Sequence, residues 1–158
     1  MASIVYFSLG SNLGEKERNI QNALALIAKR IGRILACSAN YENKAWGFAS
    51  EHLFFNAAAK VETELPIQKV LTEILHIERL LGRTKKSENG IYQDRIIDID
   101  ILFFDDKIVD NEKLKVPHPL LAKRDFVLKP LCEIAPDLIH PILKKSIREL
   151  YSNLSKDI

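Results

Sequence analysis

Two helix-like stripes, each lying between strand-like segments, constrain the fold of this chain more than any other feature. Apolar residues recur at helical spacing from Ile20 to Ile31 and again from Ile67 to Leu81, and a glycine follows each stripe. Four segments have the composition or the alternation of strands: residues 3–10, 33–42, 54–63 and the run that begins at Asp94. The order of elements along the chain is therefore β-α-β-β-α-β.

This order predicts an α+β domain with a ferredoxin-like core, in which a mostly antiparallel sheet carries both helices on one face. The rest is expected to form a C-terminal extension: a short strand near the sheet edge within 107–116, a turn from Pro117 to Pro119, and a helix around Lys129 to Ile134. No element is assigned to the tail. A chain of 158 residues is too short for two ordinary domains, so residues 1–158 are interpreted as one.

Composition limits the classes of protein to which the chain can belong. Apolar residues make up 47% and charged residues 28%, which is typical of a globular domain, and no apolar run is long enough to span a membrane. The N-terminal segment is interpreted as a strand and not as a signal peptide. Cys37 and Cys132 lack a CxxC spacing, so we expect free thiols in a reducing, cytoplasmic compartment. The net charge of +2 gives no indication of nucleic-acid binding. We expect a monomer.

The last strand-like segment, DRIIDIDILFFDD at residues 94–106, carries two carboxylates within a strand pattern. Asp98 and Asp100 alternate with Ile97, Ile99, Ile101 and Phe103, which are expected to face the core. Residues i and i+2 of a strand are about 6.5 to 7 Å apart at Cα and point the same way. Hard oxygen ligands at this spacing suit Mg²⁺ held together with phosphate groups. The alternative, which the pattern leaves open, is a solvated acidic strand face.

Basic residues gather in the loop before this strand. Arg83, Lys85 and Arg95 are close in sequence to the aspartates, and cations beside such carboxylates are the groups that phosphoryl transfer needs. A solvated basic loop is the alternative interpretation. Glu78 follows the apolar stripe of the second helix, either at its edge or paired near the site. His118 lies in the proline turn, where a histidine is more often structural or exposed than functional.

A flat pocket for a planar heterocycle is one interpretation of the aromatic residues in and after the loop at 43–52. Trp46, Phe48, Phe54 and Phe55 could stack on such a ring and the Asn56 amide could read its edge, although most rings at such positions belong to the core. The sequence has no P-loop, no dinucleotide-binding glycine motif, no zinc-like pairing of histidines and no recognisable Ser-His-Asp set. Phosphate binding must therefore depend on other groups.

Several blocks, in order along nearly the whole chain, resemble one family. They are GSNLG at 10–14, FFNAA at 54–58, the run from Glu78 through GRT at 82–84 to DRIIDIDIL at 94–102, VPHP at 116–119, and KRDFVLKPLCEIAP at 123–136. The family is 6-hydroxymethyl-7,8-dihydropterin pyrophosphokinase, of folate biosynthesis. The resemblance implies that the ATP pyrophosphoryl group is transferred to the hydroxymethyl oxygen of 6-hydroxymethyl-7,8-dihydropterin and that AMP is released.

The resemblance also implies roles for individual residues. Asp98 and Asp100 would ligate two Mg²⁺ ions bound with ATP, and Arg83 and Arg95 would be catalytic arginines that stabilise charge on the phosphates. The residues that match ATP-binding positions are Glu78, Lys85, Tyr92, Ile101, His118 and Arg124. The residues that match pterin-binding positions are Gly10, Asn43, Trp46, Phe54, Asn56 and Phe126. The loops at 43–52 and 83–94 are candidate lids that exclude water.

The chain departs from the family pattern in these two loops. Residues 43–45, Asn-Lys-Ala, stand where Thr-Pro-Pro is common, and Trp46 stands where a Leu-like residue is usual. Lys85 replaces a frequent arginine and can supply charge but not a bidentate fork. Tyr92 would replace the frequent tryptophan of the same loop.

A non-catalytic ferredoxin-like module that binds RNA or a small effector is the alternative of a different class. Two carboxylates on the sheet face would weaken RNA binding, and the stacking aromatics of the RNP pattern are missing. A kinase that moves a single phosphoryl group is a third interpretation, and it would release ADP in place of AMP. The expected partners are ATP and the pterin, with neither nucleic acid nor a membrane.

Overall fold

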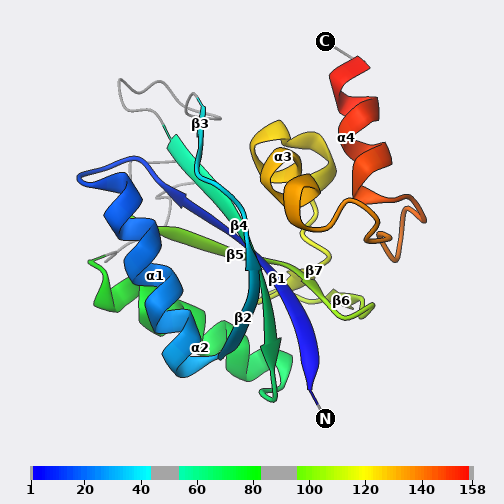
Figure 1. The fold of residues 1–158 in the computed structure, drawn as a ribbon. Coiled ribbons are helices and arrows are strands. Elements are labelled where there is room, and N and C mark those ends of the chain that lie inside the picture. Colours follow the sequence, from blue (N-terminus) through cyan, green and yellow to red (C-terminus); the bar gives the residue numbers. More distant parts are fainter. Residues whose placement is uncertain (1, 44–53, 83–95, 157–158) are drawn as a thin grey trace.

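A computed structural model describes residues 2–43, 54–82 and 96–156 of the chain (Figure 1). The first elements are β1 (Ser3–Ser11), α1 (Lys16–Arg30), β2 (Gly32–Cys37), β3 (Tyr41–Asn43), β4 (Phe54–Thr63), α2 (Ile67–Leu80) and β5 (Asp98–Phe104). The C-terminal extension contains β6 (Val109–Asp110), β7 (Lys115–Val116), the 3₁₀ turn η1 (Leu121–Lys123), α3 (Asp125–Ile134) and α4 (Ile147–Lys156).

The main sheet has the strand order of a ferredoxin-like fold. β1 pairs antiparallel with β4 on one side and with β5 on the other. β2 pairs with β4, which gives the order β2-β4-β1-β5, and β3 pairs with the beginning of β4. Each β-α-β unit therefore leaves a gap of one strand that the other unit fills. The predicted fold class is confirmed.

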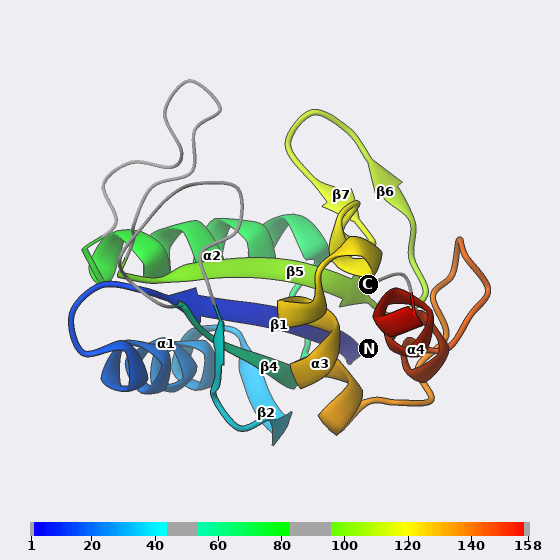
Figure 2. The ribbon, with the colours of Figure 1, turned by 90° about the horizontal axis from the view of Figure 1, so that it is seen from above.

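Helices cover both faces of this sheet (Figure 1). α1 and α2 pack on one face, as predicted, where Phe7 of β1 meets Ile27 and Ile74 in the larger hydrophobic core. The extension covers the other face with α3 and α4, and this second core contains Tyr6, Leu102, Phe103, Leu128, Leu131 and Ile147. In Figure 2 α4 lies beside the C-terminal end of β5, away from the end where β5 begins.

A β-bulge interrupts the alternation of β5. The register between β1 and β5 shifts between Tyr6 and Phe7, because Phe7 pairs with Ile101 whereas Tyr6 pairs with Phe103. Phe103 therefore lies in the second core with Leu102, and Phe104 lies in the first. The expectation that Phe103 shares the face of the isoleucines was wrong, since a bulge places one extra residue between two pairs and changes the faces after it.

Four other features differ from the expected ones. Residues 33–42 form two strands, because the Ser38 hydroxyl donates to Ala39 O (2.8 Å) and accepts from Ala58 N (2.9 Å) where the strand is interrupted. β6 and β7 pair with each other in a separate two-stranded sheet. α3 begins at Asp125 and contains Pro130 in its interior, and α4 was not assigned from the sequence.

Within the described ranges, no helix has the length and apolar character that crossing a membrane requires.

Candidate active site

Asp98 and Asp100 project from the same face of β5. Ile99 between them is 3% exposed and packs in the core beneath α1 and α2, so the two half-buried carboxylates face the side of the sheet on which α3 lies. Their neighbours on β1 are small: Gly10 is opposite Asp98 and Ser8 is opposite Asp100. The prediction that the two carboxylates share one face is confirmed.

Gly10 connects the acidic pair to an amide on the next strand. It pairs with Asp98 on β5 and with Asn56 on β4, so three strands bring these residues into one row. A Cβ atom on Gly10 would lie 3.1 Å from Asn56 Oδ1 and 3.7 Å from Phe54 Cδ1. Because glycine has no side chain, the space between the carboxylates and the Phe54 ring stays open.

Asn56 is held in place by a second amide. It is 4% exposed, and its Nδ2 donates a hydrogen bond to Asn43 Oδ1 at the end of β3. β3 pairs with β4 so that Tyr41 is opposite Asn56. The predicted pterin-side residues Gly10, Asn43, Phe54 and Asn56 are thus contiguous in the structure.

The beginning of α3 adds a cation and a ring to the same face. The guanidinium carbon of Arg124 lies 5.6 Å from the centroid of the Phe126 ring, a cation–π distance. Arg124 is 7% exposed and Phe126 is half-buried against the second core. An aromatic ring held this way can stack on a planar ligand.

His118 lies close enough to Asp98 and Arg124 for their charges to act on it. Burial lowers the pKa of His118 to about 4, the Arg124 guanidinium acts in the same direction, and the Asp98 carboxylate opposes them. Leu120 N donates to His118 Nδ1 at 3.2 Å, which places the proton of the neutral ring on Nε2. At neutral pH His118 is therefore an uncharged donor near the site.

Glu78 connects α2 to the strand that carries the aspartates. It is 3% exposed, and its Oε2 accepts a hydrogen bond from Ile99 N at 2.9 Å. β5 is the edge strand of the main sheet, and an edge strand presents backbone groups that need partners. Of the two alternatives for Glu78, the buried and paired one is the observed one.

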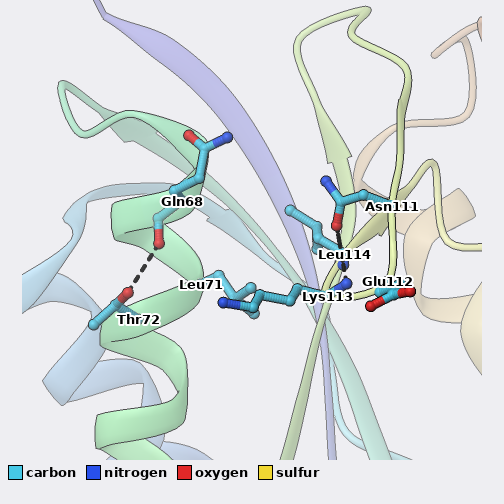
Figure 3. A pocket seen from close by; sticks show the side chains of 7 residues that line it. All are labelled: Gln68, Leu71, Thr72, Asn111, Glu112, Lys113 and Leu114. Atoms are coloured by element: carbon cyan, nitrogen blue, oxygen red, sulfur yellow. Dashed lines mark hydrogen bonds between the residues drawn. The ribbon is translucent and has the colours of Figure 1, made fainter.

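A cavity of about 200 Å³ opens beside Asp100 and His118. Its lining comes from α2, β5 and the β6–β7 region: Leu71, Ile74, Leu75, Ile99, Asp100, Ile101, Lys113, Leu114, Lys115, His118 and Pro119. An adjoining cavity of about 560 Å³ lies between α2 and the β6–β7 turn and shares Leu71, Lys113 and Leu114 with it. Figure 3 shows the Lys113 side chain extending from that turn towards Leu71.

The residues of these cavities were partly missed in the sequence. Leu71 and Leu75 fall within the apolar stripe predicted from Ile67 to Leu81, where their spacing fits a role in the core. Lys113 and Lys115 follow the aspartates in the sequence, where no motif marks them as site residues. Their position beside Asp100 depends on the β6–β7 turn, whose Asn111 Oδ1 accepts from the backbone N of Lys113 and Leu114, each at 2.9 Å.

Comparison with known proteins identifies the family. The model of the family described as 7,8-dihydro-6-hydroxymethylpterin-pyrophosphokinase matches residues 6–136. The chain belongs to this pyrophosphokinase family. A relative from Porphyromonas gingivalis named 2-amino-4-hydroxy-6-hydroxymethyldihydropteridine pyrophosphokinase is 47% identical over 140 residues, covering 88% of this chain and 95% of the relative. A relative of the same name from Aquifex aeolicus is 41% identical over 145 residues, covering 92% and 88%.

Solved structures agree with the fold. A crystal structure described as HPPK-DHPS in complex with substrates matches 99% of this chain with a TM-score of 0.77 at 16% identity. This chain spans 44% of that solved chain. The likeness therefore shows that this pyrophosphokinase shares its fold with the corresponding part of a longer protein.

The acidic pair of this pyrophosphokinase fits a magnesium ion in its donor set. Within the ranges 2–43, 54–82 and 96–156, no cluster of three or more His, Cys, Asp or Glu side chains could hold a metal by itself. Two carboxylates beside a cavity suit Mg²⁺, which commonly binds one or two carboxylates and takes its other ligands from phosphates and water. This arrangement differs from a transition-metal site, in which the protein itself supplies most of the ligands.

Five predicted site residues of the pyrophosphokinase fall outside the described residues: Trp46, Arg83, Lys85, Tyr92 and Arg95. The two candidate lid loops also lie there, apart from Asn43. The other predicted residues, from Gly10 to Phe126, lie on one side of the sheet or along β5 and its contacts. Two groups can be distinguished: the carboxylates beside the cavity at the β5 edge of the sheet, and the amides and rings further along the same face, near α3.

Proposed function

We propose that this chain transfers the pyrophosphoryl group of ATP to the hydroxymethyl oxygen of 6-hydroxymethyl-7,8-dihydropterin in folate biosynthesis, with release of AMP. The observation that carries the proposal is the row Asp98, Gly10 and Asn56, because it puts a metal-type carboxylate pair beside an amide that can read a heterocycle. Family membership supplies the reaction, and this row supplies two adjacent binding regions for its two substrates.

The nucleotide lies at the β5 edge of the sheet, beside the cavity that α2, β5 and the β6–β7 region line. Asp98 and Asp100 hold two Mg²⁺ ions together with the ATP phosphates, and Ile101 and the neighbouring cavity receive the nucleoside. When bound, the metal neutralises charge on the phosphate oxygens. Arg124 contributes positive charge, and neutral His118 can donate from Nε2 without adding any. Glu78 acts beside the nucleotide by holding Ile99 and hence both aspartates.

The pterin occupies the side towards α3. Its planar ring stacks between Phe126 and Phe54, and the Asn56 amide, oriented by Asn43, reads the polar edge. Gly10 leaves room for the hydroxymethyl group to approach the phosphates. Trp46 is proposed as a further pterin-binding residue from its place in the sequence motif.

The reaction needs positioning and charge neutralisation more than a covalent intermediate. The hydroxymethyl oxygen forms a bond to the β-phosphorus, the bond from that phosphorus to the α,β-bridging oxygen breaks, and AMP leaves with that oxygen. The hydroxyl proton passes to solvent. Arg83 and Arg95 stabilise the charge that develops on the transferred group, and Lys85 and Tyr92 contact ATP from the same loop.

One assay tests this function. Protein is incubated with ATP, Mg²⁺ and the hydroxymethyl dihydropterin, and the nucleotide products are separated. AMP that appears only with the pterin present is expected; ADP, or no turnover, would contradict the proposal. The RNA- or effector-binding alternative is not favoured, because the face that such a module would use carries Asp98 and Asp100.

The chain acts as a cytoplasmic monomer without a nucleic-acid partner. Both cysteines, exposed Cys37 and half-buried Cys132, are free thiols, which suits a reducing compartment. Light scattering after gel filtration is expected to give the mass of one 18.0 kDa chain.

A further inference from the structure

One side of α3 contacts Tyr41 of β3 through a hydrogen bond and a cation–π interaction. The Glu133 carboxylate accepts a hydrogen bond from the Tyr41 hydroxyl at 2.5 Å and from Ala39 N at 3.2 and 3.3 Å. One helical turn earlier, Lys129 Nζ lies 5.1 Å from the centroid of the Tyr41 ring. Phe126, Lys129 and Glu133 are spaced i, i+3 and i+7, so they share one side of the helix.

The same two elements carry opposite walls of the pterin region. Tyr41 pairs with Asn56, and Asn43, two residues further along β3, accepts the hydrogen bond from the Asn56 amide. Phe126 projects from the first turn of α3. The contact between Tyr41 and Glu133 therefore joins β3, whose Asn43 holds the Asn56 amide, to the helix that bears Phe126.

We propose that Tyr41 and Glu133 are positioning residues for the pterin: their contact sets the width of the slot between Phe126 on α3 and the paired strands β3 and β4, which carry Asn43, Phe54 and Asn56. This inference rests on the proposed function, because the slot is defined by the heterocycle that it receives. Stacking is sensitive to width, since a gap of about 0.5 to 1 Å on one side of a ring forfeits a quarter to a half of the contact energy. Neither residue touches the reacting atoms.

The protonation of Tyr41 agrees with its role as a hydrogen-bond donor. The hydrogen bond to Glu133 raises the pKa of the Tyr41 phenol, and burial and the Glu133 charge add to this. The hydroxyl therefore stays protonated and able to donate across the neutral range.

The test compares three substitutions with one control. Tyr41→Phe keeps the ring near Lys129 but removes the donor, Glu133→Ala removes the acceptor, and Glu133→Gln keeps an acceptor oxygen. Glu149→Ala, an exposed acid on α4, is the control. Pterin affinity is measured by calorimetry with a non-hydrolysable ATP analogue and Mg²⁺, and KM for each substrate and kcat are measured by AMP formation.

Tyr41→Phe and Glu133→Ala are expected to raise the pterin Kd and KM about three- to tenfold, the effect of losing one hydrogen bond. The KM for ATP should change less than twofold, and Glu133→Gln and Glu149→Ala should resemble the wild type. An unchanged pterin Kd in both Tyr41→Phe and Glu133→Ala, or equal rises in both KM values, would overturn the inference. Absence of AMP from the wild type would instead contradict the proposed function, while the calorimetric comparison would still decide the role of Tyr41 and Glu133.

Discussion

At the scale of single residues, the two aspartates occupy positions that no packing requirement explains. Each lies opposite a small residue, Gly10 or Ser8, on a face where β5 later places Leu102 in a core. Two half-buried like charges on alternate residues repel each other, which disfavours the folded state unless cations lie nearby. Such a conflict between burial and charge is expected at a functional site.

Asp100→Asn tests this reading. The change keeps the shape of the side chain but removes one of two charges that bind Mg²⁺, so AMP formation should fall by at least about 100-fold. The far-ultraviolet circular dichroism spectrum and the melting temperature should be retained, since repulsion with Asp98 is also removed. Asp106→Asn, an exposed turn residue just after β5, is the matched control and should keep full activity. Undiminished turnover in Asp100→Asn would remove the metal assignment.

His118 gives a second prediction, on acid stability. Its pKa in the folded protein, about 4, is below the ordinary value of 6.5, so the folded state favours the neutral ring. The stability due to this neutral ring is fully present above pH 6.5 and is lost as the pH falls towards 4. His118→Asn supplies an oxygen in place of Nδ1 for the Leu120 N–H but cannot titrate.

The melting temperature of the His118→Asn variant should therefore fall less than that of the wild type between pH 7 and pH 4.5. Burial also lowers the pKa of His140, and that residue is present in both proteins, so the difference between them isolates His118. Equal losses in the two proteins would count against a buried, neutral His118.

At the scale of elements, the contact between α2 and β5 is the one on which the acidic pair depends. Glu78→Leu leaves the Ile99 N–H without its acceptor, and an unsatisfied buried donor costs roughly 1–3 kcal/mol. Glu78→Gln retains an acceptor and should cost less. Urea unfolding measures both, and Glu15→Ala, which breaks an exposed pair with Arg18, is the control with an expected change under about 0.5 kcal/mol. A Glu78→Leu protein as stable as the wild type would show that the hydrogen bond is unimportant.

The elements also show what periodicity can and cannot predict. Apolar spacing was sufficient for α1 and α2, because each buries one stripe against a sheet. It could not predict the bulge at Leu102, since a strand sequence does not contain the position at which its neighbour slips by one residue. The helix predicted around Lys129 to Ile134 started too late: α3 begins at Asp125 and contains Pro130, a residue that is normally found in the first turn of a helix.

The proposed site residues also divide into those that local sequence patterns predict and those that they do not. Asp98, Asp100, Gly10 and Asn56 could be proposed as site residues from the sequence because they lie within local motifs, and the predicted topology pairs the strands that carry them. Tyr41 and Glu133 could not, because they are 92 residues apart and meet only through the packing of α3 on β3. Contacts of that kind depend on docking between elements, which carries no local sequence signal.

At the scale of the whole molecule, the proposed site lies on the sheet face that the C-terminal extension covers, at the end where β5 begins. The core beneath α1 and α2 supports the other face, whereas the second core holds α3 and with it Arg124 and Phe126. The ferredoxin-like order therefore supplies the strands and the aspartates, and the extension supplies the ring. Pterin binding should accordingly depend on the second core more than on the first.

A pair of core substitutions tests this dependence. Ile147 on α4 and Ile27 on α1 are both 0% exposed, one in each core, so Ile147→Ala and Ile27→Ala should each cost about 2–5 kcal/mol of unfolding free energy. Assayed well below their melting temperatures, only Ile147→Ala should raise the pterin KM, because loosening α4 lets α3 and Phe126 shift. The KM for ATP in Ile27→Ala should stay near that of the wild type. If Ile27→Ala raised the pterin KM equally, the slot would depend on global stability and not on the extension.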